Sequence, residues 1–316
     1  MKKRLSKFVN SIIGMPQLFN YMEQTRQQAK DDMHHTRLLL GKMLANQVKL
    51  RGVYEDVEEA EFKVFSQFGD DGILQYLIHQ TCPEKHTFIE FGVQDYEEAN
   101  TRFLLENDNW SGLIVDGDPA NIEYVRRSPN FWRYDLEAIA RFVDCNNINT
   151  IFEEAGFTGE IGLLSIDIDG NDYWVWEAIN SVNPAIVTVE YNSVFGAEHA
   201  LTVPYDPVFY RTHAHYSNLF WGASLKALCL LAEKKGYAFV GCNSAGNNAH
   251  FVRKDKVGKI PVKSVKQGYR ESKFRESRDK DGKLTLLPGH QRISAIQDMQ
   301  VVDIEKGITT QLKELM

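Results

Sequence analysis

The chain has 316 residues, which is long for one simple domain and short for three. Hydrophobic residues make up 43% and charged residues 25%, as in an ordinary soluble globular protein, and the net charge is −7. This acidic balance argues against nucleic acid as the main partner, because binding to a phosphate backbone needs a basic surface. No apolar run approaches the roughly 20 residues of a membrane span, so we expect no transmembrane segment.

The cysteines and the first residues indicate a cytoplasmic protein. Cys82, Cys145, Cys229 and Cys242 form neither a CxxC pair nor a His/Cys metal spacing, so we expect reduced thiols. The first 15 residues have a charged head and only a short, interrupted apolar part, which makes a weak signal peptide. A plain N-terminal helix is favoured over an interfacial amphipathic anchor.

Residues 17–40 contain no Gly or Pro and are rich in good helix formers, which predicts a long helix. Thr25 and the pair His34-His35 interrupt its apolar seam, so the pattern does not support a clean coiled coil. The helix is either an arm for self-association into a homo-oligomer or a helix packed on its own domain. We divide the chain into three parts: an N-terminal helical segment (1–60), an α/β domain (61–255) and a basic C-terminal extension (256–316).

The middle part alternates between helical and strand patterns. We expect strands at 87–93, 112–115, 141–143, 163–168 and 185–191. Helices are expected at 70–80, 100–107, 120–127, 148–155, 173–179 and 223–235. Two further strands, 237–240 and 249–253, flank a Gly/Asn-rich loop and suit a hairpin. The predicted fold is α/β: a doubly wound, mostly parallel, seven-stranded Rossmann-like sheet with an antiparallel C-terminal hairpin strand and an N-terminal helical arm.

The composition changes after the hairpin. Residues 254–283 hold 11 Lys or Arg against 5 Asp or Glu. A solvated, partly irregular extension is the plain interpretation of this charge run. The sharper interpretation is a basic flap over an anionic substrate.

Carboxylates cluster where the strand 163–168 ends. Asp167, Asp169 and Asp172 follow an apolar run in the segment LLSIDIDGND. Ligands of open parallel sheets bind outside the carboxyl ends of the strands. Such a group needs a metal, a base partner or water, because unpaired buried carboxylates are costly. The alternative is an acidic loop that caps the next helix through Asn171 or Asp172.

Glu90 and Gly92 close the strand 87–93, where a glycine lets a ligand approach the backbone. The dinucleotide pattern GxGxxG is absent, and the acidic residues that follow would repel a pyrophosphate. Asp116 ends the next strand, where an acid can bind both hydroxyls of a ribose; alternatively, DGDP is only a turn. Together these features favour an adenosine-type ligand that carries positive charge and no phosphates.

With these residues the chain resembles the class I S-adenosylmethionine-dependent methyltransferases, and within them the FkbM-like group, many members of which act on sugars or polyketides. The likeness covers roughly residues 65–255 and rests on TFIEFGV, LIVDGDP, LLSIDIDGNDYWVW and the final hairpin. It implies S-adenosylmethionine as the cofactor, held by Glu90, Gly92, Asn100 and Asp116. The glycine-rich loop of the family is reduced here to Gly92, which departs from the family pattern.

The resemblance also implies a metal. In metal-dependent members of this fold, an acid after the fourth strand and an acid/amide pair after the fifth bind Mg²⁺; here these are Asp167, Glu190 and Asn192. Hard oxygen ligands suit Mg²⁺ or Ca²⁺ rather than Zn²⁺. A metal would hold a substrate diol and lower the pKa of a hydroxyl. Alternatively, Glu190 is a strand-end residue bound to backbone.

The acceptor side is expected from residues 192–221. This segment is rich in Tyr, Phe and Trp, which stack on sugar rings, and holds several histidines. His213 and His215 lie on one face if the segment is extended, and either could serve as the base or as a metal ligand; Asp169 is a rival base. The expected activity is therefore O-methylation of a hydroxyl on a sugar or glycan-type acceptor, assisted by Mg²⁺.

Three alternatives stay open. The Asp-x-Asp after an apolar strand also occurs in haloacid dehalogenase-like phosphatases, although Asn171 departs from their pattern. It occurs too in metal-dependent glycosyltransferases, which need a diphosphate site that the acidic turn after Gly92 does not provide. The last alternative is a non-catalytic methyltransferase-like scaffold.

Overall fold

A seven-stranded sheet forms the centre of the computed structural model. The structure describes residues 2–128 and 131–315, and for residues 2–17 it describes the backbone alone. The strand order is β3-β2-β1-β4-β5-β8-β7. Neighbouring strands from β3 to β5 are parallel, and β8 runs antiparallel to both β5 and β7. The predicted doubly wound sheet with an antiparallel hairpin strand is confirmed.

The bounds of the elements are as follows. The sheet contains β1 (Thr87–Phe91), β2 (Ser111–Asp116), β3 (Leu136–Ala140), β4 (Gly159–Ile166), β5 (Val182–Glu190), β7 (Tyr237–Cys242) and β8 (Asn248–Arg253). Its long connections contain α2 (Asp70–Thr81), α3 (Arg102–Asp108), α4 (Pro119–Arg127), α5 (Ile148–Glu154), α6 (Asp172–Ala178) and α8 (Leu225–Lys235). Short turns of helix are η1 (Val57–Ala60), η2 (Phe131–Arg133), η3 (Ser193–Phe195), α7 (Arg211–Ala214), α9 (Val265–Gly268), α10 (His290–Ala295) and η4 (Leu312–Glu314).

Helices cover both faces of the sheet and give two separate apolar cores. On one face α5, α6 and α8 pack on side chains such as Ile89 and Leu164. On the other face α2, α3 and α4 pack on side chains such as Phe88 and Leu163. Ile89 and Phe88 are consecutive residues, so β1 follows the alternation of a strand that is buried on both sides.

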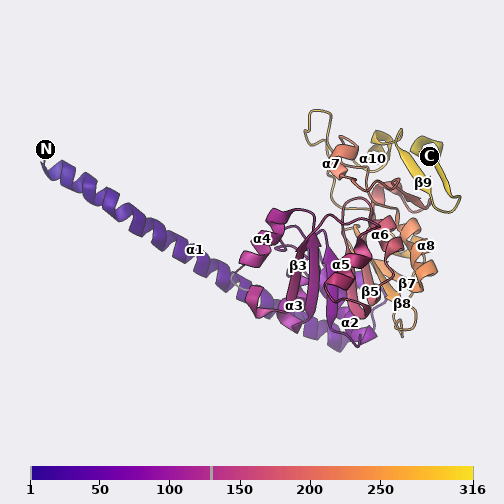
Figure 1. Cartoon of the computed structure of the whole chain (residues 1–316), viewed down its shortest axis with the longest axis horizontal. Helices are drawn as coiled ribbons and strands as arrows, with labels where there is room; N and C mark the ends of the chain where they lie inside the picture. Colours follow the sequence, from indigo (N-terminus) through magenta and orange to yellow (C-terminus); the bar gives the residue numbers. More distant parts are fainter. Residues whose placement is uncertain (1, 129–130, 316) are drawn as a thin grey trace.

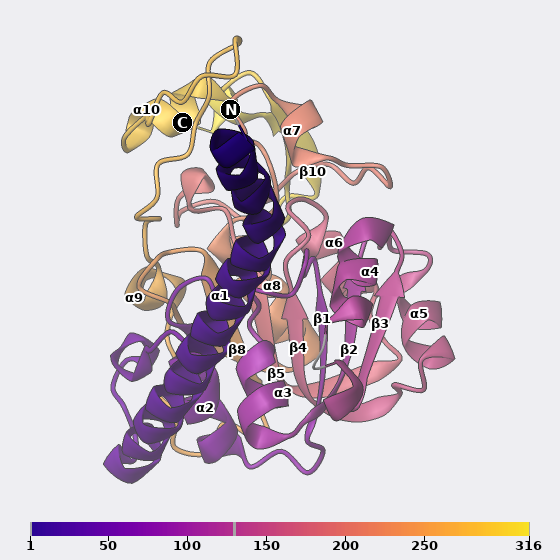
Figure 2. The same cartoon turned by 90° about the vertical axis from the view of Figure 1, so that its left-hand side faces the viewer.

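The first helix, α1 (Lys2–Arg51), is longer than the sequence predicted and extends far out of the body of the molecule (Figure 1). Its last turns contain the buried residues Gly41, Ala45 and Val48 and pack on α2 and α3, with Gly41 close to Phe103 of α3. The Nε2 atom of His34 lies 2.6 Å from a carboxylate oxygen of Glu106 on α3. Residues before this contact project away from the sheet, as the view along the arm also shows (Figure 2).

A second, three-stranded sheet lies beside the carboxyl ends of the parallel strands. It is antiparallel, with the order β10-β9-β6, and joins β6 (Leu201–Thr202) to β9 (Gln300–Asp303) and β10 (Ile308–Gln311). It has its own apolar core, which includes Leu201, Val301 and Leu312. We call this sheet with α7 and α10 the cap; Figure 1 shows it above the main sheet.

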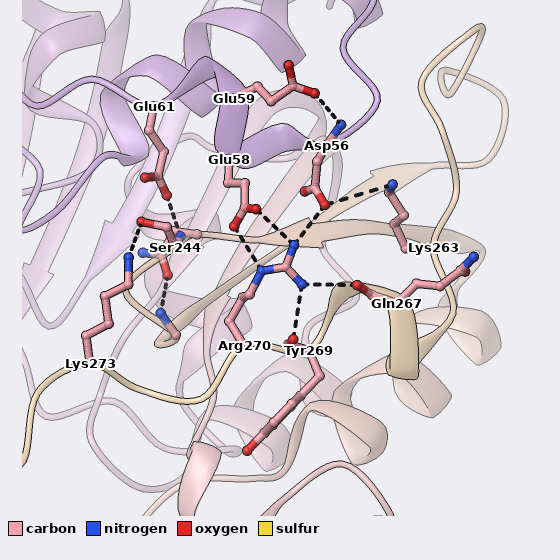
Figure 3. A network of polar contacts seen from close by, with 12 residues as sticks. Asp56, Glu58, Glu59, Glu61, Ser244, Lys263, Gln267, Tyr269, Arg270 and Lys273 are labelled. Carbon is pink, nitrogen blue, oxygen red and sulfur yellow. Dashed lines mark hydrogen bonds and ion pairs between the residues drawn. The ribbon is translucent and has the colours of Figure 1, made fainter.

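The segment that leads into the cap is fastened to the body by ion pairs (Figure 3). Arg270 donates to Asp56 at 2.8 Å and to Glu58 at 2.9 Å, both at η1. Lys273 donates to Ser244 in the β7–β8 loop at 3.0 Å. The basic run after β8 is therefore attached to acidic residues that precede α2.

Two features differ from the sequence-based predictions. The third strand is residues 136–140 and not 141–143, because β3 is an edge strand in which only Ala138 is buried and its apolar pattern is weak. Strands β9 and β10 were not predicted; they lie in a polar segment and are held by pairing with β6 and with each other. None of the described helices has the length and hydropathy needed to cross a bilayer.

Candidate functional site

Carboxylates mark the carboxyl ends of four adjacent strands. In the spatial order β2-β1-β4-β5 these are Asp116, Glu90, Asp167 and Glu190. Parallel strands end at the same edge of the sheet, so the four acids line one edge. This is the place at which the sequence predicted a ligand site.

Glu90 is buried and is held by the residues that begin α3. Its carboxylate accepts hydrogen bonds from the backbone N–H of Asn100 at 2.9 Å and of Thr101 at 3.0 Å, and from the Thr101 hydroxyl at 2.5 Å. Burial raises the pKa of Glu90, and these hydrogen bonds oppose the shift. The Asn100 side chain donates to Ser165 at 3.1 Å. Glu90 and Asn100 thus lie together, and both are used to shape the β1–α3 loop.

A glycine is required at position 92 because the backbone there packs closely against the segment that follows β4. It has φ +78°, and a Cβ atom there would lie 1.5 Å from the carbonyl oxygen of Asp167. The close approach expected at this glycine is therefore made by the backbone after β4. This contact sets the distance between the β1 loop and the acidic loop.

Asp116 is buried and fixes the turns around it. One carboxylate oxygen accepts from the backbone N–H of Gln94 at 2.7 Å. The other accepts from the backbone N–H of Asp118 at 2.9 Å and from Asn121 at 3.0 Å. Residues 116–119 (DGDP) therefore form the turn that the alternative interpretation expected. The oxygen that meets Gln94 keeps a second lone pair for a ligand hydroxyl.

Asp167, Asp169 and Glu190 form one acidic group. An oxygen from each lies within 4.8 Å of the others, which is close enough to share one cation. The pKa values of Asp167 and Glu190 are raised well above the usual range, first by burial and then by the neighbouring carboxylates. The group therefore favours either a shared proton or a bound cation.

Unpartnered oxygens support a ligand at this group. The Oε2 atom of Glu190 is buried without a hydrogen-bond partner among the described residues. Asn248 is paired with Glu190 in the β5–β8 ladder, and its Oδ1 atom is also buried without such a partner. Directly paired residues of an antiparallel ladder point to the same face. Two free acceptor oxygens beside a carboxylate group fit a hard cation such as Mg²⁺. Asn248 was not predicted, since only the pairing of β8 with β5 brings it here.

The loop after β4 is held by the first residue of α6. Asp172 accepts from the backbone N–H groups of Ile168 and Gly170, each at 2.9 Å, and burial raises its pKa to about 6. Asn171 is the N-cap residue of α6, although its side chain makes no capping bond and instead donates to the Asp206 carbonyl at 2.7 Å. Asp172 therefore holds the loop that precedes α6 and does not cap the helix, while Asp167 and Asp169 remain in the acidic group.

Arg211 connects the acidic group to the cap. It donates to Asp169 at 2.5 Å and lies 3.5 Å from Glu276, and its guanidinium stacks over Trp221. Asp169 has φ +54°, and its carboxylate faces Arg211, the first residue of α7. The sequence analysis missed Arg211, although it lies in the segment assigned to the acceptor.

Other predicted site residues lie differently. The amide of Asn192 is buried and committed: it donates to the carbonyls of Leu219 and Trp221 and accepts from Val194. Asn192 therefore holds the backbone at the cap entrance through both groups of its amide. His213 lies within α7 and His215 directly after it, so the extended backbone that would align them is absent. His215 is half-buried, and its Nδ1 atom lies 2.7 Å from the Ser217 hydroxyl.

A cavity of about 440 Å³ lies elsewhere on the sheet. Residues of α8, β7 and the segment after β8 line it, among them Cys229, Tyr237 and Lys254. Tyr237 pairs with Arg253, at the opposite end of β8 from Asn248. This cavity is therefore not part of the acidic site.

No protein-family model and no curated protein matches the sequence. Among solved structures, the chain is similar to the N-terminal domain of EvdMO1 with SAH bound, at 11% identity over 60% of this chain and 80% of that chain (TM-score 0.38). It is also similar to the O-methyltransferase from Bacillus cereus in complex with SAH, at 13% identity over 57% and 78% (TM-score 0.38). A third is PKMT2 from Rickettsia typhi in complex with AdoHcy, at 10% identity over 60% and 53% (TM-score 0.39). At such low similarity, the fold of this chain is established by its own strand order.

Proposed function

We propose that this protein is an S-adenosylmethionine-dependent O-methyltransferase that acts on a hydroxyl of a sugar or glycan-type acceptor with the help of Mg²⁺. The observation that carries the proposal is the row of acids at the ends of β2, β1, β4 and β5. The first two suit the adenosine and methionine ends of the cofactor, and the last two suit a cation. The FkbM-like resemblance of the sequence supports the same assignment.

At the cofactor end, Asp116 would bind the ribose hydroxyls, and Glu90, Gly92 and Asn100 would shape the loop that holds the methionine part. The carboxylate of Glu90 offers negative charge next to a sulfonium and an ammonium group. The absence of a basic phosphate cradle in the β1–α3 loop agrees with a cofactor that has no phosphates. Rate enhancement would come mainly from aligning the methyl group with the acceptor oxygen.

At the metal end, Asp167, Asp169 and Glu190 would hold Mg²⁺, with Asn248 in place of Asn192. When bound, Mg²⁺ lowers the pKa of a coordinated hydroxyl. Asp169 belongs to the group that would hold the cation, so we assign the role of the base to a histidine instead. Burial and the charge of Lys280 lower the pKa of His215, which keeps it neutral and able to accept a proton near pH 7. His213 is exposed and packs on Tyr210.

The acceptor would lie between the acidic group and the cap. Phe209 covers the acidic loop so closely that a Cβ on Gly170 would lie 2.2 Å from its ring. An aromatic face over a row of oxygen ligands suits a polyhydroxylated ring.

The four unpaired cysteines agree with a cytoplasmic location.

Calorimetric titration of the full chain with S-adenosylhomocysteine, with and without Mg²⁺, tests the function. We expect binding in the micromolar range, and Asp116→Asn should weaken it by about 10-fold or more through the loss of a charge-assisted hydrogen bond. UDP-sugars serve as the contrast. Binding of a UDP-sugar only with Mg²⁺ would replace this proposal with a glycosyltransferase. Binding of neither compound would favour a phosphatase or a scaffold.

We also propose that α1 pairs two copies of the chain. On the side of α1 away from the body, uncharged residues recur with spacings of four, three and four, an 11-residue repeat that suits helices paired in a right-handed supercoil. This stripe consists of Leu18, Met22, Thr25, Ala29, Met33, Thr36 and Leu40, all of them exposed. Met33→Glu should convert a dimer into a monomer in analytical ultracentrifugation, because two charges would be buried between the helices. Gln28→Glu, on the flank of the stripe, should leave the dimer intact; equal behaviour of both variants would contradict the pairing.

A further inference from the structure

Arg292 of α10 is a buried cation with unused donors. The residue is 6% exposed, and burial is the main reason that its pKa is lowered. Its Nη1 atom donates to the Ser272 hydroxyl at 2.5 Å. Its Nε atom is buried and has no hydrogen-bond partner among the described residues. Within the part of the chain that the structure describes, Arg292 forms no ion pair.

Two other half-buried arginines of this region are, in contrast, each paired with two carboxylates. Arg270 is paired with both Asp56 and Glu58 (Figure 3), and Arg211 with Asp169 and Glu276. An uncompensated buried charge costs several kcal/mol, because a guanidinium loses its hydration there. A folded protein keeps such a group where a ligand completes it or where it performs a function.

Arg292 is attached to the residues that follow the acidic group. The Ser272 that it contacts donates its backbone N–H to the Ser193 hydroxyl at 3.1 Å, and α10 packs on η3, which begins at Ser193. Ser193 is the third residue after Glu190. Ala214 of α7 and Ile293 of α10 pack against the same apolar core of the cap, so Arg211 and Arg292 belong to helices that share this core. Burial lowers the pKa of Arg292, and the charge of the exposed Glu271 raises it more than the charge of Arg211 lowers it, but Glu271 forms no ion pair with Arg292 among the described residues.

We propose that the acceptor carries an oxyanion, a phosphate or a carboxylate group, which the free Nε edge of Arg292 binds beside Arg211. The Nε–Nη2 edge of a guanidinium presents two parallel donors that match two oxygens of such a group. Negative charge near three carboxylates needs a cation of its own, and Arg211 is already paired with Asp169 and Glu276. That the bound molecule is the methyl acceptor rests on the proposed function. That Arg292 binds an oxyanion does not depend on methyl transfer.

The test is calorimetric titration of the full chain, without any S-adenosyl compound, using inorganic phosphate, glucose 6-phosphate, glucuronate and glucose. We expect glucose 6-phosphate or glucuronate to bind and glucose to bind far more weakly. Arg292→Met should weaken oxyanion binding by about 10–100-fold, because two charge-assisted hydrogen bonds are lost. Arg275→Met, which removes an exposed charge from the same extension, should leave it unchanged.

The unfolding midpoint without ligand separates a binding role from a structural one. Arg292→Met should raise the midpoint or leave it unchanged, because it removes an unpaired buried charge; a clear fall would mean that Arg292 only supports the cap. If Arg292→Met does not fold, Arg292→Lys decides, since it keeps the charge and loses the two-donor edge. Wild-type affinity in either variant, or no oxyanion binding to the wild type, would overturn the proposal. S-adenosylhomocysteine is titrated separately, so a failure of the cofactor assignment is recognised independently.

Discussion

Glu190→Gln should abolish Mg²⁺ binding and Mg²⁺-dependent methyl transfer while leaving the protein folded. The amide keeps the size of the side chain and removes one charge from a group whose members repel one another. Changing even the outer partners of metal ligands costs about 10–100-fold in affinity, so the loss of a ligand carboxylate should cost at least about 100-fold. Calorimetry with Mg²⁺ measures this directly. Without Mg²⁺, the variant should be as stable as the wild type or more stable.

The same group predicts a dependence on pH. The pKa values of Asp167 and Glu190 are raised in the folded protein, so the metal-free protein binds protons more tightly than the unfolded chain does. The contribution of these two groups to stability is then greatest in acid and is lost as the pH rises through their raised pKa values. Mg²⁺ competes with the protons, and it should raise the unfolding midpoint more at about pH 8 than at about pH 5.

Glu154→Gln removes an exposed carboxylate at the end of α5 and serves as the matched control. It should bind Mg²⁺ like the wild type. An equal rise of the midpoint with Mg²⁺ in Glu190→Gln and in the wild type would show that the cation binds elsewhere.

Gly92→Ala should destabilise the protein by about 2–5 kcal/mol. The left-handed backbone conformation alone costs a non-glycine residue about 1–2 kcal/mol, and overpacking adds about 1–3 kcal/mol. Here the added Cβ would lie 1.5 Å from the Asp167 carbonyl oxygen, so the β1 loop and the acidic loop must move apart. Denaturant unfolding measures the loss, and S-adenosylhomocysteine and Mg²⁺ binding should weaken together.

Gly156→Ala isolates the contribution of the clash. Gly156 has φ +79°, nearly the φ of Gly92, and a Cβ there would meet nothing within 4 Å. The free energy of unfolding of this variant should therefore fall only by the cost of the left-handed backbone, about 1–2 kcal/mol. If both variants lose the same free energy of unfolding, the contact with Asp167 does not constrain the site.

Most of the main sheet could be predicted from the sequence, because strands buried on both faces are apolar throughout and helices alternate with them. The run before Asp167 and the run before Asn192 both became central strands, β4 and β5. Strands at the edges of the sheets were harder to predict from the sequence. Strand β3 is poor in apolar residues, and β9 and β10 are held by partners distant in sequence.

The candidate site shows the same division. Glu90, Asp116, Asp167 and Glu190 were predicted, since acids at the ends of parallel strands must share one edge of the sheet. The role of Asn192 was predicted from its position alone, and its amide proved to be committed to backbone groups of the cap entrance. Spacing along the chain gives the position of a side chain but not its hydrogen-bond partners.

The sequence by itself determined the order of the elements and the edge of the sheet at which the acids gather, because both follow from local periodicity and from the parallel direction of the strands. Only the tertiary structure revealed the further candidate residues. Asn248 comes from an antiparallel strand, Arg211 from an irregular segment and Arg292 from the C-terminal extension. Asn248 reaches this edge through the pairing of β8 with β5, whereas the positions of Arg211 and Arg292 depend on how the cap packs, and no periodicity in the sequence records either contact.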